Sequence, residues 1–315
     1  QRQETALREW CQEAESLARY AFFAAAAAGH PYSRPRLGTL AALARLTADE
    51  CRHWYDHVRR AVPRYAFFAG DIGAEEALHW LEQLQEVFPA DGTEEFTLPE
   101  WSREWSRRAV FIEKPGSLQG ALTLGLPAPR MGEEAYPAAY VITAYLGGYF
   151  LARLNRRLRE QEGMTYGASA ALSPLRAGAV VLIETSVATK HLERACRVVL
   201  QELEQLQENP VPEEEFRRAL RVLYGSILRR TVTLDGVLGL YTGALVQGCS
   251  AEYPQHFLEL VRRLTPEQLV PVQQRFFRPD RVLIAASGDA GEVLPQLAAF
   301  GTPERILSPC HDAGT

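Results

Sequence analysis

An internal repeat constrains the fold of this chain more than any other feature of its sequence. Residues 46–71, LTADECRHWYDHVRRAVPRYAFFAGD, match residues 264–289, LTPEQLVPVQQRFFRPDRVLIAASGD, at an offset of 218 positions and without a gap. Each copy begins with a Thr suited to cap a helix and ends in an apolar run followed by Gly-Asp. The repeat predicts two copies of one unit, each with a helix, a buried strand and a further helix.

The second copy can be traced back to a complete unit over residues 109–300. The first two strands are expected to pair with each other across a Gly-containing turn. The pattern predicts an α+β fold in which antiparallel sheets pack with helices. The expected strands before the repeated segment are 109–115, 120–129, 164–172 and 177–187, and the expected helical stretches are 136–161, 191–208 and 212–228.

The first unit is expected to be incomplete. The same offset places its start about 109 positions before Gln1. We therefore interpret residues 1–90 as its back half, 91–108 as a polar linker, and 301–315 as a C-terminal tail. Because half a sheet cannot bury its apolar face alone, an upstream segment or another chain is expected to supply the missing layer.

Charge and hydropathy exclude two classes of function. The formal net charge of −5 gives no basic surface for nucleic acid. The basic run from Arg153 to Arg159 alternates with Leu at helical spacing and is interpreted as a solvated helix face. No apolar run reaches the roughly 18 residues that a membrane span needs.

The five cysteines are scattered and odd in number. They form no C-x-x-C pair, which argues against a disulfide framework or a structural zinc site, and most are expected to be buried as small apolar residues. The compartment stays open between the cytoplasm and the bacterial periplasm. The cysteines are Cys11, Cys51, Cys196, Cys249 and Cys310.

Three strings fall in the order seen in the pitrilysin/insulinase family of inverted-motif zinc peptidases, which includes the mitochondrial processing peptidase. They are GHPYSRPRLGTLAAL at 29–43, YAFFAGD at 65–71 and LGGYFLARLNRRLREQEGMTYG at 146–167. The resemblance covers about residues 20–300. It implies two homologous α/β-sandwich units, the first lacking its front half here. One departure is Ala152, where the family usually has Ser.

The resemblance also implies a site. In that family one unit carries zinc on His-x-x-Glu-His and a distant Glu, and the facing unit contributes an Arg and a Tyr seven residues apart. The matching residues are Arg159 and Tyr166. The phenol would stabilise negative charge on the scissile carbonyl, and the guanidinium would hold a neighbouring peptide carbonyl. From the residues alone, a surface charge and a strand aromatic in the core remain open.

No His-x-x-Glu-His occurs in the chain. In HWYDH, His53 and His57 share one helix face with Asp56 between them, a geometry that could ligate zinc. The repeat argues against this, because Pro271 and Arg275 stand at the positions that match the two histidines. An amphipathic surface helix is the better interpretation.

Other candidates are set aside. Glu4 and Glu9 are available near the start of the chain for the distant glutamate, but without the motif neither is assigned. His30 is expected to be a turn and packing residue. Gly147 and Gly148 are expected to allow close helix packing rather than to touch substrate.

The sequence thus predicts the substrate-binding, non-zinc component of a zinc metallopeptidase acting on unfolded peptides. This chain would hold no metal, and zinc would come from a partner or from a missing N-terminal segment. The expected partner is a zinc-bearing subunit of the same family, or a second copy of the chain. The alternative is an inactive scaffold like the core subunits of a respiratory complex; a third possibility is a stand-alone metalloenzyme built on HWYDH.

Overall fold

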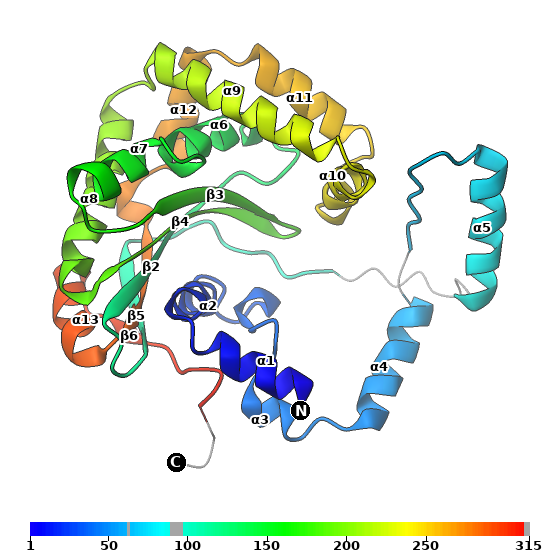
Figure 1. Cartoon of the computed structure of the whole chain (residues 1–315), viewed down its shortest axis with the longest axis horizontal. Coiled ribbons are helices and arrows are strands. Elements are labelled where there is room, and N and C mark those ends of the chain that lie inside the picture. Colours follow the sequence, from blue (N-terminus) through cyan, green and yellow to red (C-terminus); the bar gives the residue numbers. More distant parts are fainter. Residues whose placement is uncertain (62–63, 89–96, 312–315) are drawn as a thin grey trace.

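A six-stranded mixed sheet forms the centre of the molecule, in the order β3-β4-β2-β5-β1-β6 (Figure 1). The computed structural model describes residues 1–61, 64–88 and 97–311. β1 runs parallel to β5 and β6, and the other neighbours are antiparallel. The strands are β1 (Arg108–Glu113), β2 (Gln119–Pro127), β3 (Ala168–Leu175), β4 (Gly178–Ala188), β5 (Leu283–Gly288) and β6 (Glu304–Arg305).

The expected pairing of the first two strands is wrong, because β5 lies between β1 and β2. Two strand spacings are about 10 Å, and residues 114–118 are long enough to cross them at about 3.3 Å per residue. The end of β5 also holds this connection. Lys114 N donates to Gly288 O at 2.7 Å, and Gly116 N donates to an Asp289 carboxylate oxygen at 2.9 Å.

Helices cover both faces of the sheet, and alternate strand residues supply the two cores. Phe111 and Ile284 face a large helical layer, whereas Val110, Ile112 and Leu283 face α2. The sequence did not predict α10 or α11. The helices are α1 (Arg2–Trp10), α2 (Ala14–Ala26), α3 (Leu40–Leu43), α4 (Ala48–Ala61), α5 (Ala74–Val87), α6 (Tyr136–Gly147), α7 (Arg153–Asn155), α8 (Leu192–Glu208), α9 (Glu213–Arg230), α10 (Leu234–Val246), α11 (Tyr253–Arg263), α12 (Pro266–Phe276) and α13 (Ala290–Leu297).

Helix α2 precedes residues 46–71, the first copy of the repeat, and packs on the central sheet. The Phe22 ring occupies the space that a side chain at Gly125 would need, since a Cβ there would lie 2.1 Å from the ring. Of the expected linker, residues 91–96 lie outside the described residues. Beyond them Trp101 is buried and donates from Nε1 to Ala26 O at 2.7 Å, which ties this segment to α2.

The repeat is visible in local geometry. Thr47 and Glu50 cap α4 reciprocally, at 2.8 Å and 3.2 Å, and Thr265 and Gln268 form the same capping box at α12. At the far end of each copy, Gly70 has φ +139° and Gly288 has φ +159°. The two copies therefore begin and end in the same way.

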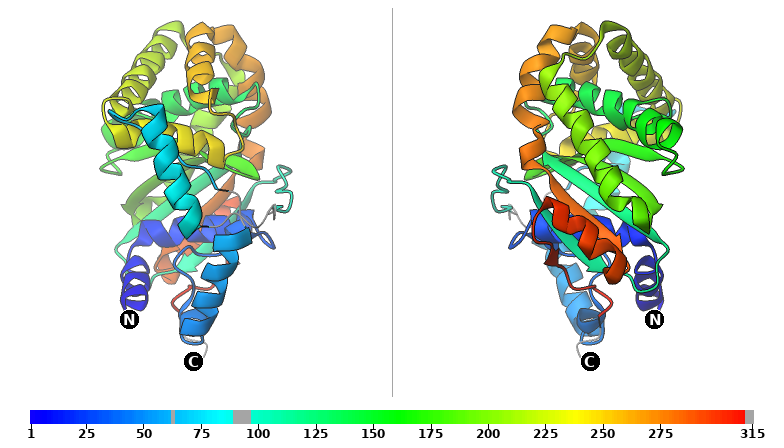
Figure 2. Two further views of the ribbon diagram at one scale, coloured as in Figure 1. Left: turned by 90° about the vertical axis from the view of Figure 1, so that its right-hand side faces the viewer. Right: turned by 90° about the vertical axis from the view of Figure 1, so that its left-hand side faces the viewer.

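The middle of the first copy does not form the expected strand. Residues 65–70 form no helix or strand and pair with no strand in the part of the chain that the structure describes, and Tyr65 is 68% exposed. Trp80 and Leu84 of α5 are also exposed. Figures 1 and 2 show α4 and α5 projecting to one side of the sheet. The prediction of a buried strand here is wrong for this chain, because strands equivalent to β1 and β2 are not beside it.

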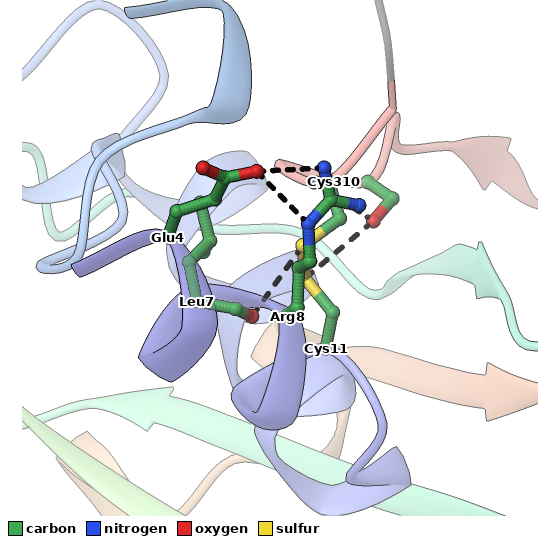
Figure 3. The surroundings of a disulfide bond; sticks show 6 residues. Glu4, Leu7, Arg8, Cys11 and Cys310 are labelled. Atoms are coloured by element: carbon green, nitrogen blue, oxygen red, sulfur yellow. Dashed lines mark hydrogen bonds and ion pairs between the residues drawn. A yellow bond between two sulfur atoms is a disulfide. The ribbon is translucent and has the colours of Figure 1, made fainter. Parts of the chain in front are cut away.

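A disulfide joins Cys11, at the end of α1, to Cys310 near the C-terminus (Figure 3). The Cα atoms lie 6.5 Å apart, although the residues are 299 positions apart in sequence. The expectation of unpaired cysteines is therefore wrong for this pair. The expectation of burial is met by Cys196, whereas Cys51 is exposed and Cys249 is partly buried.

Within the described residues, every helix is too short or too polar to span a lipid bilayer.

Candidate functional site

The segment between α6 and β3 carries both predicted site residues. It begins where α6 packs tightly on the sheet. A Cβ at Gly147 would lie 2.4 Å from Ala170 N, and one at Gly148 would lie 2.6 Å from Ala144 Cα. The expectation of close packing is confirmed at Gly147, whereas Gly148 is exposed and its close contact lies within its own helix. The chain then turns and enters α7, which continues into a π-helical turn over Arg156–Gln161, a geometry that is rare and frequent at functional sites.

The loop before β3 is held by side-chain hydrogen bonds in place of sheet pairing. The Thr165 hydroxyl lies 2.8 Å from both Gly167 O and Ser186 O, and the Thr185 hydroxyl donates to Gly167 O at 3.0 Å. Asn155, buried in α7, accepts from Ala168 N at 2.8 Å. Because these bonds satisfy the backbone, β3 begins at Ala168 rather than at 164 as expected.

Tyr166 stands between these anchors, and its side chain is 95% exposed. The interpretation of Tyr166 as a strand aromatic in the core is therefore wrong. The Arg159 guanidinium lies 3.9 Å from the centre of the Phe150 ring, itself 62% exposed. Within the described residues Arg159 forms no ion pair. An exposed phenol and an exposed apolar ring thus lie on one short segment with a partly buried guanidinium, a set that can donate hydrogen bonds to carbonyl oxygens and stack with planar groups.

Acidic side chains anchor the basic run behind this segment. Glu202 of α8, 1% exposed, forms ion pairs with Arg153 and Arg157, the second at 3.0 Å. Arg156 pairs with Glu215 of α9 at 2.5 Å. The interpretation of the run as a solvated helix face is therefore wrong for these three arginines.

Sequence reasoning missed Glu202, although its position carries a signal. It lies four residues after Val198 and four before Leu206, on the buried face of an amphipathic helix. A carboxylate at such a position needs buried partners. The Tyr145 hydroxyl, whose pKa burial raises to about 12, accepts from Arg153 at 2.9 Å and extends the cluster to α6.

The residues of HWYDH do not fit a zinc ion. In α4 the His53 side chain is exposed, Asp56 pairs with Arg59 at 3.7 Å, and the rings of Trp54 and His57 lie 5.6 Å apart. Across residues 1–61, 64–88 and 97–311, no three His, Cys, Asp or Glu side chains come together in a group that could hold a metal.

The remaining candidates have structural contacts. The His30 side chain is 6% exposed; its Nδ1 accepts from Tyr32 N at 3.1 Å and its Nε2 donates to Pro99 O at 3.0 Å. Its expected turn and packing role is confirmed. Glu4 pairs with Arg8 at 3.0 Å, and Glu9 is exposed.

A family model described as the peptidase M16 inactive domain matches residues 45–223, more than half of the chain. The chain belongs to this family. The match contains residues 46–71, the first copy of the repeat, ends before the second copy, and includes Arg159 and Tyr166. The expected kinship with zinc peptidases is confirmed at this level.

Individual M16 relatives are similar over much of the chain. A protein of Streptomyces coelicolor named an uncharacterized zinc protease is 26% identical over 218 residues, which are 68% of this chain and 46% of that protein. The chain thus spans about half the length of that relative.

The predicted α+β fold, with a sheet packed by helices, is confirmed by solved structures. An M16 inactive domain from Pseudomonas fluorescens superposes with a TM-score of 0.77 at 20% identity, over 91% of this chain and 69% of that one. A chain of Complex III2 from Candida albicans superposes with a TM-score of 0.75 at 11% identity, over 96% of this chain and 73% of that one. At these identities the likeness shows the fold alone.

Proposed function

We propose that this chain is the substrate-binding, non-zinc component of a zinc metallopeptidase that processes or degrades unfolded peptides. Membership of the M16 inactive-domain family supports a place beside an active zinc-bearing chain. The observation that carries the proposal is Tyr166, whose side chain is 95% exposed while its neighbours on both sides are held by hydrogen bonds. A phenol held in this way suits contact with another molecule better than packing within this one.

Tyr166 would act on the scissile carbonyl. Cleavage of an amide builds negative charge on that oxygen, and a hydroxyl donor already held in place stabilises the charge without reorganisation. Thr165 and Asn155 hold the loop and act through Tyr166, so they are positioning residues.

Arg159 would hold the peptide beside the scissile bond. The Phe150 ring restrains its guanidinium, so less side-chain freedom is lost when its donors meet a peptide carbonyl. Among the described strands β3 is the last on its side of the sheet, and its outer edge can add an extended peptide through backbone hydrogen bonds.

The metal would lie outside this chain. Because the described residues hold no cluster that fits zinc, the proposal places it on a zinc-bearing M16 subunit, or on a segment that precedes Gln1. A second copy of the chain is a further possible partner.

The test combines this chain with a zinc-bearing M16 subunit, preferably one encoded beside it, and follows cleavage of an unstructured fluorogenic peptide. We expect activity from the mixture and none from this chain alone. Tyr166→Phe removes only the hydroxyl and should lower kcat about 10²-fold. Arg159→Gln should mainly raise KM.

Two matched variants serve as controls. Tyr55→Phe removes a hydroxyl from an exposed side chain of α4, and Arg221→Gln removes an exposed charge from α9. Both mixtures should keep the wild-type rate. A wild-type rate with Tyr166→Phe would refute the role of the phenol.

The alternative of an inactive scaffold is supported by the likeness to a chain of Complex III2. The same mixture separates the two. A scaffold would form a stable complex with a partner, but the complex would not cleave the peptide. If cleavage did occur, its rate would not change in the Tyr166 and Arg159 variants.

A further inference from the structure

A cavity of about 560 Å³ lies under α10, away from the segment that carries Tyr166. Its walls come from α6, α9, α10, α11 and the last residues of β3, so it is part of the helical layer. Exposed residues such as Arg230, Thr231 and Gly239 line its rim, which means that it reaches the surface. Its volume is in the range of small-molecule sites.

The walls of the cavity are largely apolar. Leu172 closes the side towards the sheet, and Ile227, Leu240 and Phe257 come from the surrounding helices. The Phe257 ring packs against Tyr136 and Tyr140, with ring centres 5.9 Å and 5.4 Å apart. These surfaces suit a hydrocarbon or aromatic group.

Several polar groups that line the cavity have no hydrogen-bond partner among the described residues: the Tyr136 and Tyr140 hydroxyls, and the buried Oε1 of Gln247. Tyr136 is 3% exposed and lines the cavity, yet its hydroxyl makes no hydrogen bond to any residue that the structure describes. By contrast, the Tyr253 hydroxyl accepts from Gly132 N at 3.2 Å, and that of Tyr241 accepts from Gln255 at 3.0 Å. The Tyr136 hydroxyl keeps some accessible surface, so it can donate to an acceptor bound in the cavity.

The phenols here remain donors across the physiological pH range. Burial raises the pKa of Tyr136, and the neighbouring Tyr140, Tyr253 and Cys249 raise it further. Burial also raises the pKa of Tyr140, although the nearby positive charge of Arg230 opposes the shift. Neutral phenols donate to an acceptor, so the environment favours a ligand with a hydrogen-bond acceptor.

Arg230 gives the rim its charge. It is the one charged residue in the lining, and it pairs with no carboxylate among the described residues. An unpaired guanidinium beside an apolar cavity favours an anionic group at the cavity mouth, and a carboxylate matches its planar donors.

We propose that this cavity binds an apolar ligand that bears a carboxylate, with Tyr136 donating to the ligand and Arg230 supplying the countercharge. The same chemistry is present in a free fatty or aryl acid and in the apolar C-terminal residue of a peptide. The site is separate from Arg159 and Tyr166, so it stands whether or not the proposed peptidase role holds.

The test measures binding by isothermal titration to the 315-residue chain. The probes are decanoate, with decanol as its uncharged match, and acetyl-Ala-Leu-Phe, with its C-terminal amide as its uncharged match. We expect an acid to bind about tenfold or more tightly than its match, as a charge-assisted hydrogen bond would give. Tighter binding of decanoate identifies a free acid as the source, and tighter binding of the peptide identifies a C-terminus.

Substitutions in the cavity lining test whether the ligand binds there. Gly243 of α10 lines the cavity and a Cβ there meets nothing within 4 Å, so Gly243→Leu should project into the cavity and abolish binding. Its control is Thr242→Leu, the next residue of the same helix. Arg230→Gln should remove the preference for the acid, and the neighbouring Arg229→Gln should leave it unchanged.

Tyr136→Phe keeps the ring packing and tests the hydroxyl alone, with an expected loss of several-fold in affinity for the acid. It also keeps the proposal testable if Gly243→Leu does not fold, which circular dichroism would reveal. No binding of either acid up to about 1 mM, equal binding of acid and uncharged match, or unchanged binding in Tyr136→Phe and Arg230→Gln would overturn the proposal.

Discussion

At the scale of the residue, sequence spacing predicted the candidate site residues but not the residues that hold their segment in place. The seven-residue interval between Arg159 and Tyr166 is visible in the sequence, and the exposure of Tyr166 agrees with a role in contact. The anchors of the segment are Asn155 and Glu202, and each acts on residues from another element. Contacts of this kind depend on how α7 and α8 are brought together, which local sequence does not specify.

Glu202 gives a prediction at this scale. Glu202→Gln should destabilise the chain by about 3 kcal/mol, because it leaves two arginines without a counterion. The value is at the low end of the range for buried pairs, since the Arg153 and Arg157 side chains are 26% and 31% exposed. Urea unfolding followed by circular dichroism measures it. Glu204→Gln, an exposed position on α8, should change stability by less than about 0.5 kcal/mol, and equal effects of the two variants would contradict the prediction.

At the scale of the element, periodicity located most strands and helices but not their partners. The expected strands at 109–115 and 120–129 exist, yet β5 enters between them from a position far along the chain. Short loops usually join paired strands, and sequence alone gives no sign of an insertion. α10 was missed because Gly236, Gly239 and Gly243 weaken a helical pattern. The strand expected at 65–69 does not form, because no described strand lies beside it, although its sequence is suited to a sheet.

Amide exchange tests that last conclusion. Residues 65–70 donate no backbone hydrogen bond to any described residue, whereas β5 is bonded on both sides and fully buried. We expect amides of 65–70 to exchange close to the unprotected rate and those of 283–288 to be among the slowest. Mass spectrometry of peptides from the two copies measures both in one sample. Similar protection would contradict the exposed conformation of the first copy.

At the scale of the whole molecule, α2 and the disulfide join the N-terminal segment to the central sheet and to the C-terminal segment. α2 covers the second face of the central sheet, and the disulfide ties the end of α1, just before it, to the C-terminal segment. The sequence predicted the duplication but neither of these contacts. The disulfide was not predicted because the cysteines are odd in number and the two that pair are 299 positions apart.

Reduction of the disulfide gives the prediction at this scale. A closed loop of this length restricts the unfolded chain, so dithiothreitol should lower stability by about 2–5 kcal/mol, visible as a lower Tm. The double variant Cys11→Ala/Cys310→Ala should have the lower Tm with or without reductant. Cys51→Ala, at an exposed free cysteine, should behave as wild type. If dithiothreitol left the Tm unchanged, the disulfide would contribute nothing to stability.

The disulfide also determines whether cleavage of the backbone can be detected on a gel. It closes a loop between residues 11 and 310, so a single backbone cut between the two cysteines opens this loop without releasing a fragment. The exposed residues 65–70 are an accessible place for such a cut. A nicked molecule would keep its mass apart from one added water, and two bands would separate only after reduction. Gels run without reductant would therefore count cleaved molecules as intact.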